Sequence, residues 1–206
     1  MQSSKVKLRK RKSEINDYKS RNQKVPVKLN ESKKQPVLED LFEDTLKSIY
    51  HSELSYQRII PILIKASQSD NLKSEFSDYS IQSEHQIGRL EKIFDRLELT
   101  NTESSVCKAM EGLIAECNEI VNEIERGNVR DAALIIAVQK IQHYGIAVYG
   151  SLRELADILS YNKIADALDR TLDEKKNNDK MLTRIAQDVN EDAFEMTEDE
   201  EEDIML

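Results

Sequence analysis

The chain has 206 residues, of which 33% are charged and 39% hydrophobic, and it contains five Gly, three Pro and no Trp. Few helix breakers and many Glu, Lys, Leu, Ala and Ile residues favour an all-helical protein. No apolar run approaches the ~20 residues of a membrane-spanning helix, and the basic start of the chain is not followed by an apolar segment. Neither a membrane protein nor a secreted one is therefore expected.

Charge is distributed unevenly along the chain. Residues 1–35 hold twelve Lys or Arg against three acids, whereas residues 191–206 hold nine acids and no Lys or Arg. Both segments lack apolar periodicity, and a segment that buries little apolar surface cannot offset the entropy lost on ordering. We predict a disordered basic arm over residues 1–35, a helical domain over 36–190 and a disordered acidic tail over 191–206.

Five amphipathic helices are predicted between the two tails. They span about 37–66, 70–98, 104–126, 129–159 and 162–190, and the third is the short one. Pro61 is expected to bend the first helix, and Gly127 ends the third. Because the linkers have only two to five residues, consecutive helices should pack antiparallel. Four long helices and one short helix predict an all-α fold, a four-helix bundle with one additional shorter helix.

The two cysteines lie in the third predicted helix. Cys107 and Cys117 are ten residues apart, which separates them by about 15 Å along a helix and puts a disulfide out of reach. We interpret them as free thiols in a reducing compartment, the cytoplasm.

Two charged residues fall on apolar helix faces. Glu53 follows Ile49 by four positions, and Lys175 follows Leu172 by three. A carboxylate that faces a bundle core costs several kcal/mol unless it is paired or ligated. Glu53 is therefore an acid that reaches solvent at the edge of the stripe, a metal ligand or half of a buried ion pair. Lys175 is either solvated or paired with Glu53 or Asp179.

A dinuclear iron or manganese site in a bundle needs several inward carboxylates and one or two histidines. The usual arrangement takes a Glu from each of two helices and a Glu-x-x-His motif from each of the other two. No Glu-x-x-His occurs in this chain, whose three histidines are His51, His85 and His143. A histidine on a helix face is more often exposed or hydrogen-bonded than a metal ligand.

Several short motifs occur together in a characteristic order. They are LEDLF (38–42) followed by Tyr50, Glu53 and Pro61, then Gln86-Ile87 and Arg89-Leu90-Glu91, AMEGLI (109–114), VRDAALI (129–135), HY (143–144), YG (149–150), Thr171-Leu172-Asp173-Glu174 and Asp179. In this order and spacing they resemble the bacterial YciE/YciF family of ferritin-like, stress-associated proteins. The resemblance covers about residues 37–190 and implies a ferritin-like bundle with a di-iron carboxylate centre held by the first, second, fourth and fifth helices.

The chain departs from this family pattern at the positions implied to be ligands. Where the family carries acids, this chain has Gln82 on the second helix, Gln142 and Gly145 on the fourth, and Lys175 on the fifth. Since such metal sites need anionic oxygen ligands, we predict that the dinuclear site is vacated. Lys175 is then expected to pair with Glu53 or Asp179, so that an ion pair replaces the metal cluster.

A residual mononuclear site is the alternative interpretation. Glu53, His85 and His143 would hold iron or manganese if all three turn inward, and Asp179 is a further candidate ligand. His85 stands three residues after Gln82, which is the spacing of a Glu-x-x-His motif whose Glu has changed.

Three functions remain open at this level, and the first is favoured. In the first, the chain is a ferritin-like structural or interaction module without catalytic residues or a cofactor, and it forms a homodimer through its long helices. Alternatively it is a metal-dependent oxidase or ferroxidase-like protein with an altered ligand set, in which Tyr144 and Tyr149 have radical or hydrogen-bonding roles. The third possibility is weak nucleic-acid binding by residues 1–35 through counterion release.

The acidic tail also has an interpretation of its own. Its acids and the closing residues Ile204, Met205 and Leu206 are typical of a docking peptide for a protein partner, in which acids steer and apolar residues anchor. No P-loop, dinucleotide-binding motif or nucleophile elbow occurs in the sequence.

Overall fold

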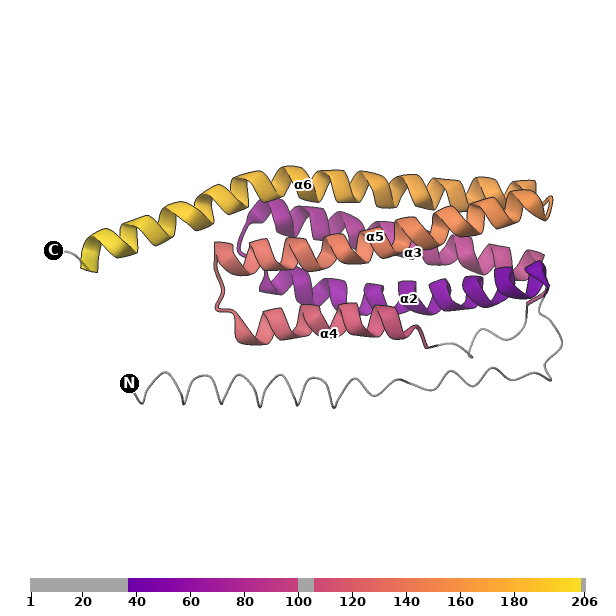
Figure 1. The fold of residues 1–206 in the computed structure, drawn as a ribbon, viewed down its shortest axis with the longest axis horizontal. Coiled ribbons are helices and arrows are strands. Elements are labelled where there is room, and N and C mark those ends of the chain that lie inside the picture. Colours follow the sequence, from indigo (N-terminus) through magenta and orange to yellow (C-terminus); the bar gives the residue numbers. More distant parts are fainter. Residues whose placement is uncertain (1–36, 100–105, 205–206) are drawn as a thin grey trace, which may run out of the picture. The chain divides into compact units, whose positions relative to one another are not determined.

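The computed structural model describes residues 37–99 and 106–204, with side chains described as far as residue 195. This part of the chain forms five helices, α2 (Leu38–Ala66), α3 (Asp70–Arg96), α4 (Lys108–Glu123), α5 (Asn128–Ile158) and α6 (Asn162–Ile204), and no strand (Figure 1). The all-α prediction is confirmed. The predicted basic arm, residues 1–35, lies outside the described residues. None of the described helices has the length and hydrophobicity needed to cross a membrane.

The four long helices α2, α3, α5 and α6 form the bundle. α5 packs most extensively along α6, and α2 along α3. Short turns join the two helices of each pair, which run antiparallel (Figure 1). The short helix α4 connects the pairs and packs against α2 and α5. This is the predicted four-helix bundle with one additional shorter helix.

Two of the predicted helix ends are corrected by the structure. α6 continues to Ile204, so the predicted helix end near residue 190 and the predicted disordered tail over 191–206 are wrong for the described residues. No Gly or Pro follows Gly150, so residues 191–206 contain no helix breaker. Without an apolar face this segment does not pack against the bundle, but its residues can still form a helix. α4 begins only at Lys108, because the Cys107 sulfur accepts the Met110 N–H and thereby caps the helix.

The core consists of two apolar clusters at different levels of the bundle. One contains Ile60, Leu63, Phe76, Leu134, Val138 and Leu182 among its buried residues. The other contains Phe42, Leu46, Leu90, Phe94, Leu152 and Leu168. Each long helix contributes to both clusters and carries polar residues between the two contributions, so a polar layer separates two apolar halves.

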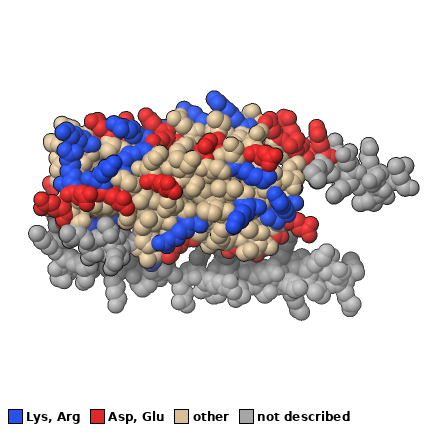
Figure 2. All heavy atoms as spheres, turned by 180° about the vertical axis from the view of Figure 1, so that it is seen from behind, with Lys and Arg blue, Asp and Glu red and all other residues tan. Residues whose placement is uncertain are grey.

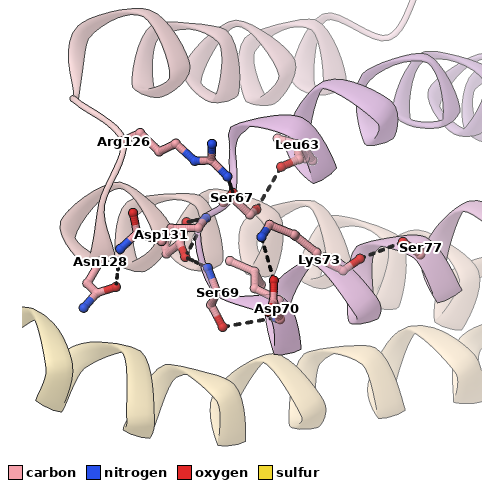
Figure 3. A network of polar contacts seen from close by, with 11 residues as sticks. Leu63, Ser67, Ser69, Asp70, Lys73, Ser77, Arg126, Asn128 and Asp131 are labelled. Atoms are coloured by element: carbon pink, nitrogen blue, oxygen red, sulfur yellow. Dashed lines mark hydrogen bonds and ion pairs between the residues drawn. The ribbon is translucent and has the colours of Figure 1, made fainter.

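A buried carboxylate holds one end of the bundle together (Figure 3). Asp131, in the first turn of α5, is fully buried and accepts backbone N–H bonds from Gln68 at 2.9 Å and Ser69 at 2.6 Å. Arg126 Nη2 donates to the carbonyl of Ser67 at 3.0 Å. The start of α5 is thereby fastened to the turn between α2 and α3, since these bonds satisfy backbone N–H groups that the turn leaves free.

Candidate functional site

The polar layer lies at mid-height between the two apolar clusters. Its buried polar residues come from all four long helices and are Ser52, Glu53, Ser83, Gln86, Gln142, Thr171, Lys175 and Asn178, which we call the central polar layer. A polar side chain at such a position must find a partner inside the protein, because water does not reach it. The partners of each group therefore decide what this layer can do.

An ion pair between Glu53 of α2 and Lys175 of α6 occupies the middle of this layer. Lys175 Nζ lies 2.9 Å from Glu53 Oε1 and 3.0 Å from Oε2. Each of the two side chains is only 3% exposed. The prediction that Lys175 pairs with Glu53 or Asp179 is confirmed for Glu53, and the interpretations of Glu53 and Lys175 as solvated residues are wrong.

Two buried tyrosines complete the surroundings of the pair. The Tyr149 hydroxyl donates to Glu53 Oε1 at 3.0 Å, and Lys175 Nζ lies 5.3 Å from the centre of the Tyr56 ring. Burial and the nearby Glu53 carboxylate raise the pKa of Tyr56 and Tyr149 well above the usual value of 10.0. Both phenols are therefore neutral at physiological pH, so that Tyr149 is a stable hydrogen-bond donor to the carboxylate.

Gly145 provides the space for the lysine side chain. A Cβ atom at this position of α5 would lie 3.3 Å from both Cδ and Cε of Lys175. A glutamate at position 145, which the sequence resemblance implies for the family, would compete with the lysine stem for this space. Gly145 and Lys175 thus belong to one arrangement, which spacing along the sequence could not reveal.

The polar side chains at the margin of the layer, Glu174 and Gln82, also form hydrogen bonds or ion pairs with neighbouring helices. Glu174 accepts from Arg89 Nη2 at 2.5 Å and from Gln86 Nε2 at 2.9 Å. The neighbouring Gln82 of α3 is an amide, and its Oε1 atom accepts from Asn178 Nδ2 at 3.0 Å. Glu174 is therefore bound by side chains of α3, and it does not add a free carboxylate to the centre.

The histidines predicted as alternative ligands do not meet Glu53. His143 is 66% exposed, and its Nε2 atom lies 3.1 Å from Asp179 Oδ1 on the surface between α5 and α6. His85 is exposed on α3, and His51 on α2 is half-buried. Within residues 37–99 and 106–195, no group of three or more His, Cys, Asp or Glu side chains could hold a metal ion. The mononuclear arrangement of Glu53, His85 and His143 is not formed.

The short helix α4 contacts the bundle through Cys107 and Tyr144. The Tyr144 hydroxyl lies 3.0 Å from Cys107 Sγ and 3.4 Å from Ser52 Oγ. Burial alone would raise the pKa of the Cys107 thiol, but hydrogen bonds from Ser52, Tyr144 and the Met110 N–H lower it overall. Burial raises the pKa of Cys117 to about 11. Both cysteines are free thiols, as predicted, and Tyr144 acts here as a packing and hydrogen-bonding residue.

The donor atoms of the central polar layer do not fit a dinuclear iron or manganese centre. Such a centre takes about four glutamates and two histidines from four helices. Here Glu53 is the one carboxylate among the buried residues of the layer, and both of its oxygens already contact an ammonium group. Gln142, which is fully buried, uses its Nε2 atom to donate to the Tyr56 hydroxyl at 3.1 Å.

Comparison with known proteins assigns the chain to a family. A family model described as a domain of unknown function, DUF892, matches residues 37–194. Protein YciF of Escherichia coli K12 is 38% identical over 149 residues, which are 72% of this chain and 90% of YciF. The chain belongs to the YciE/YciF family. The match leaves residues 1–36 and 195–206 outside the shared domain.

Solved structures of the YciE/YciF type have the same fold. The crystal structure of the E. coli stress protein YciF matches with a TM-score of 0.73 and 36% identity, covering 76% of this chain and 99% of that one. YcfI from Rhodopseudomonas palustris matches with a TM-score of 0.69 and 30% identity, covering 74% and 96%. The ferritin-like bundle predicted from the sequence is thereby confirmed.

Proposed function

We propose that this YciE/YciF-family protein is a structural or interaction module in which an ion pair replaces the dinuclear metal centre. The observation that carries the proposal is the contact of Lys175 Nζ with both carboxylate oxygens of Glu53, at 2.9 and 3.0 Å, in the middle of the bundle. Gly145 supports it, because it provides the space that the lysine stem fills.

Electrostatics explains why the pair and a metal cluster exclude one another. Glu53 and Lys175 neutralise each other inside the bundle. A divalent cation about 4 Å from the ammonium group would be repelled by roughly 8 kcal/mol at an effective dielectric constant of 20. Without further carboxylates to offset this repulsion, the layer stabilises the bundle and does not bind iron or manganese.

The wider role we propose is that of a stress-associated protein of the cytoplasm that forms a homodimer. The relative from E. coli is called a stress protein, and a structural role has been suggested for the relative from R. palustris. Two free cysteines suit a reducing compartment. Long helices such as α5 and α6 offer the kind of surface through which helical bundles dimerise.

Metal loading tests the proposal. The purified chain is incubated anaerobically with ferrous iron, desalted and subjected to elemental analysis, and manganese is loaded in parallel. We expect far less than one metal ion per chain and no iron-dependent oxygen uptake. About two metal ions per chain would overturn the proposal in favour of a metal-dependent oxidase.

A gain-of-binding variant sharpens this test. Gln142→Glu, Gly145→Glu and Lys175→Glu together return acids to the positions where the family pattern has them and remove the ammonium group. If the scaffold is intact, this triple variant should bind iron under the conditions in which the parent chain does not. A matched triple variant, Gln142→Glu/Gly145→Ala/Lys175→Met, keeps one added acid and should bind much less. Equal iron content in the two variants would contradict the proposed ligand positions.

A further inference from the structure

A basic groove lies between the C-terminal half of α3 and the first turns of α6. It consists of two adjoining hollows of about 450 and 360 Å³ that share Arg96, Lys163 and Ile164 in their linings. Its cations are Arg89, Lys92 and Arg96 from α3 and Lys163 and Arg170 from α6. We call it the α3–α6 groove. The groove has no part in the central polar layer or in the function proposed above.

Most of these cations have no partner in the described part of the chain. Arg89 pairs with Glu174, but Lys92, Arg96, Lys163 and Arg170 are exposed and form no ion pair with any described residue. Figure 2 shows several Lys and Arg side chains at the end of the bundle at which α6 begins, on the left in that view, with Asp and Glu side chains beside them. Such a concentration of cations on a chain with net charge −9 favours binding of a compact anionic group.

Apolar side chains accompany the cations. Ile93 and Ile164 lie at the base of the groove and are almost fully buried. Leu97 and Tyr161 line the larger of the two hollows and are half-buried. The surface therefore suits a segment in which acidic and apolar residues occur together. A simple inorganic anion would use only the charged half of this surface.

We propose that the α3–α6 groove binds the acidic segment 191–206 of a second copy of this chain. The segment holds nine acids and no cation, and it ends in Ile204, Met205 and Leu206. Its acids complement the cations that lack a partner among the described residues, and its apolar residues match the base of the groove. Charge complementarity of this kind steers association and fixes which surfaces meet.

The length of α6 explains why the segment comes from another copy. Lys163 and Glu198 belong to the same continuous helix and are separated by 35 positions, which corresponds to roughly 50 Å. A rigid helix cannot fold back over this distance to place its own acids in the groove at its beginning. Two copies with antiparallel α6 helices, related by a two-fold axis, would each place the segment in the groove of the other.

The same geometry disfavours a nucleic acid as the occupant. Asp166 interrupts the row of cations within the groove, and the neighbouring exposed surface of α6 carries Asp169 and Asp173. A polyanion longer than the groove would meet Asp169 and Asp173, and it would make no use of the apolar base formed by Ile93 and Ile164. Binding of an oligonucleotide by the groove is therefore an outcome that would overturn the proposal.

A charge exchange between two variants tests the proposal in the full chain. The groove variant is Lys163→Glu/Arg170→Glu, and the tail variant is Glu200→Lys/Glu201→Lys/Glu202→Lys. Each alone should self-associate at least about tenfold more weakly than the parent chain, because like charges then face each other. Mixed in equal amounts, the two variants should associate with each other at least about tenfold more tightly than either does with itself. Sedimentation equilibrium of the chains, one of them fluorescently labelled, provides the dissociation constants.

A matched control separates this contact from an effect of net charge. Arg58 and Lys65 on α2 are exposed and lie seven positions apart, like Lys163 and Arg170. Neither forms an ion pair with a described residue. Arg58→Glu/Lys65→Glu changes the net charge equally and should leave self-association unchanged. Raising the salt from about 0.1 M to about 1 M should remove the difference between the groove variant and the parent chain, because the Debye length falls from ~10 to ~3 Å.

The remaining outcomes decide against the proposal. It is overturned if the groove variant self-associates like the parent chain, or if the mixed variants bind no more tightly than each alone. It is also overturned if deletion of residues 1–35 abolishes association while the groove variant does not, since the basic arm would then hold the acidic segment. Loss of oligonucleotide binding in the groove variant, with self-association intact, would assign the groove to nucleic acid instead.

Discussion

Glu53 and Asp131 are both buried carboxylates of this bundle, but their charges are satisfied by different groups. Asp131 accepts hydrogen bonds from the backbone N–H groups of Gln68 and Ser69. Glu53 is held by the side chains of Lys175 and Tyr149. Most side-chain changes at Gln68 and Ser69 keep these backbone donors, whereas a single side-chain change at Lys175 leaves Glu53 without its cation. The contacts of Asp131 therefore depend on Asp131 itself, and those of Glu53 depend on both partners of the ion pair.

Breaking the ion pair should have the largest effect. Lys175→Met leaves a buried, uncompensated carboxylate and should lower the free energy of unfolding by about 3–5 kcal/mol in urea denaturation. Lys180→Met, which removes an exposed lysine of the same helix, is the control and should change stability by less than about 0.5 kcal/mol. Glu53→Met/Lys175→Met should recover most of the loss, because a buried pair can be replaced by apolar side chains at little cost. Equal stability of Lys175→Met and the parent chain would contradict the interpretation of Glu53 and Lys175 as a buried ion pair.

Removing the other carboxylate should cost somewhat less. Asp131→Ala leaves the N–H groups of Gln68 and Ser69 without their acceptor, and we expect a loss of about 3 kcal/mol. Asp131→Asn keeps one acceptor oxygen in place and should lose about half as much. Urea denaturation of both variants checks this order. A larger loss for Asn than for Ala would show that the N–H contacts do not account for the role of Asp131.

A smaller effect is expected from the hydroxyl that completes the Glu53 environment. Tyr149→Phe removes one hydrogen bond to a charged group and should cost about 1.5–2 kcal/mol near pH 7. Because burial raises the pKa of Tyr149 above the usual 10.0 in the folded protein, the unfolded chain loses this proton first as the pH rises. Stability should therefore fall above pH 10, and less steeply in Tyr149→Phe. Parallel alkaline profiles for the variant and the parent chain would contradict this assignment.

The smallest changes in stability are expected from alanine substitutions at two glycines of α5, Gly145 and Gly150. A Cβ at Gly150 would meet no atom within 4 Å, whereas one at Gly145 would touch the Lys175 stem. Gly150→Ala should stabilise the helix by about 0.5–1 kcal/mol, because alanine has the higher helix propensity. Gly145→Ala should gain less, or lose stability, because the lysine stem must shift. Thermal unfolding compares the two, and an equal gain would mean that Gly145 is not required by the lysine.

Much of the fold could be predicted from the sequence because helix periodicity is a local property. The number of helices, the short length of α4, the apolar faces and the short turns α2–α3, α4–α5 and α5–α6 follow from residue spacing and from Gly127. The segment between α3 and α4, residues 97–107, is longer than the predicted two to five residues. The length of α6 was underestimated because its last residues lack an apolar face, although they contain no helix breaker. A segment can therefore be helical without an apolar face that packs on the bundle.

The candidate site could be predicted only in part. Spacing alone placed Glu53 and Lys175 on apolar faces and limited the lysine to two possible partners. Whether His85 and His143 turn inward depends on the rotation of each helix about its axis, and packing against the neighbouring helices sets that rotation. The same holds for the role of Asp131, whose donors lie 62 and 63 positions away along the chain.

The sequence by itself determined an all-α bundle of the YciE/YciF type, in which Glu53 and Lys175 fall on apolar helix faces. Only the tertiary structure decided that Lys175 pairs with Glu53 rather than Asp179 and that Gly145 makes room for it. It also showed that α3 and α6 bring into one groove four cations that form no ion pair with a described residue. The physical reason is that side-chain periodicity is recorded along each helix, whereas ion pairs and grooves form between helices. Their geometry depends on how residues distant in sequence pack together.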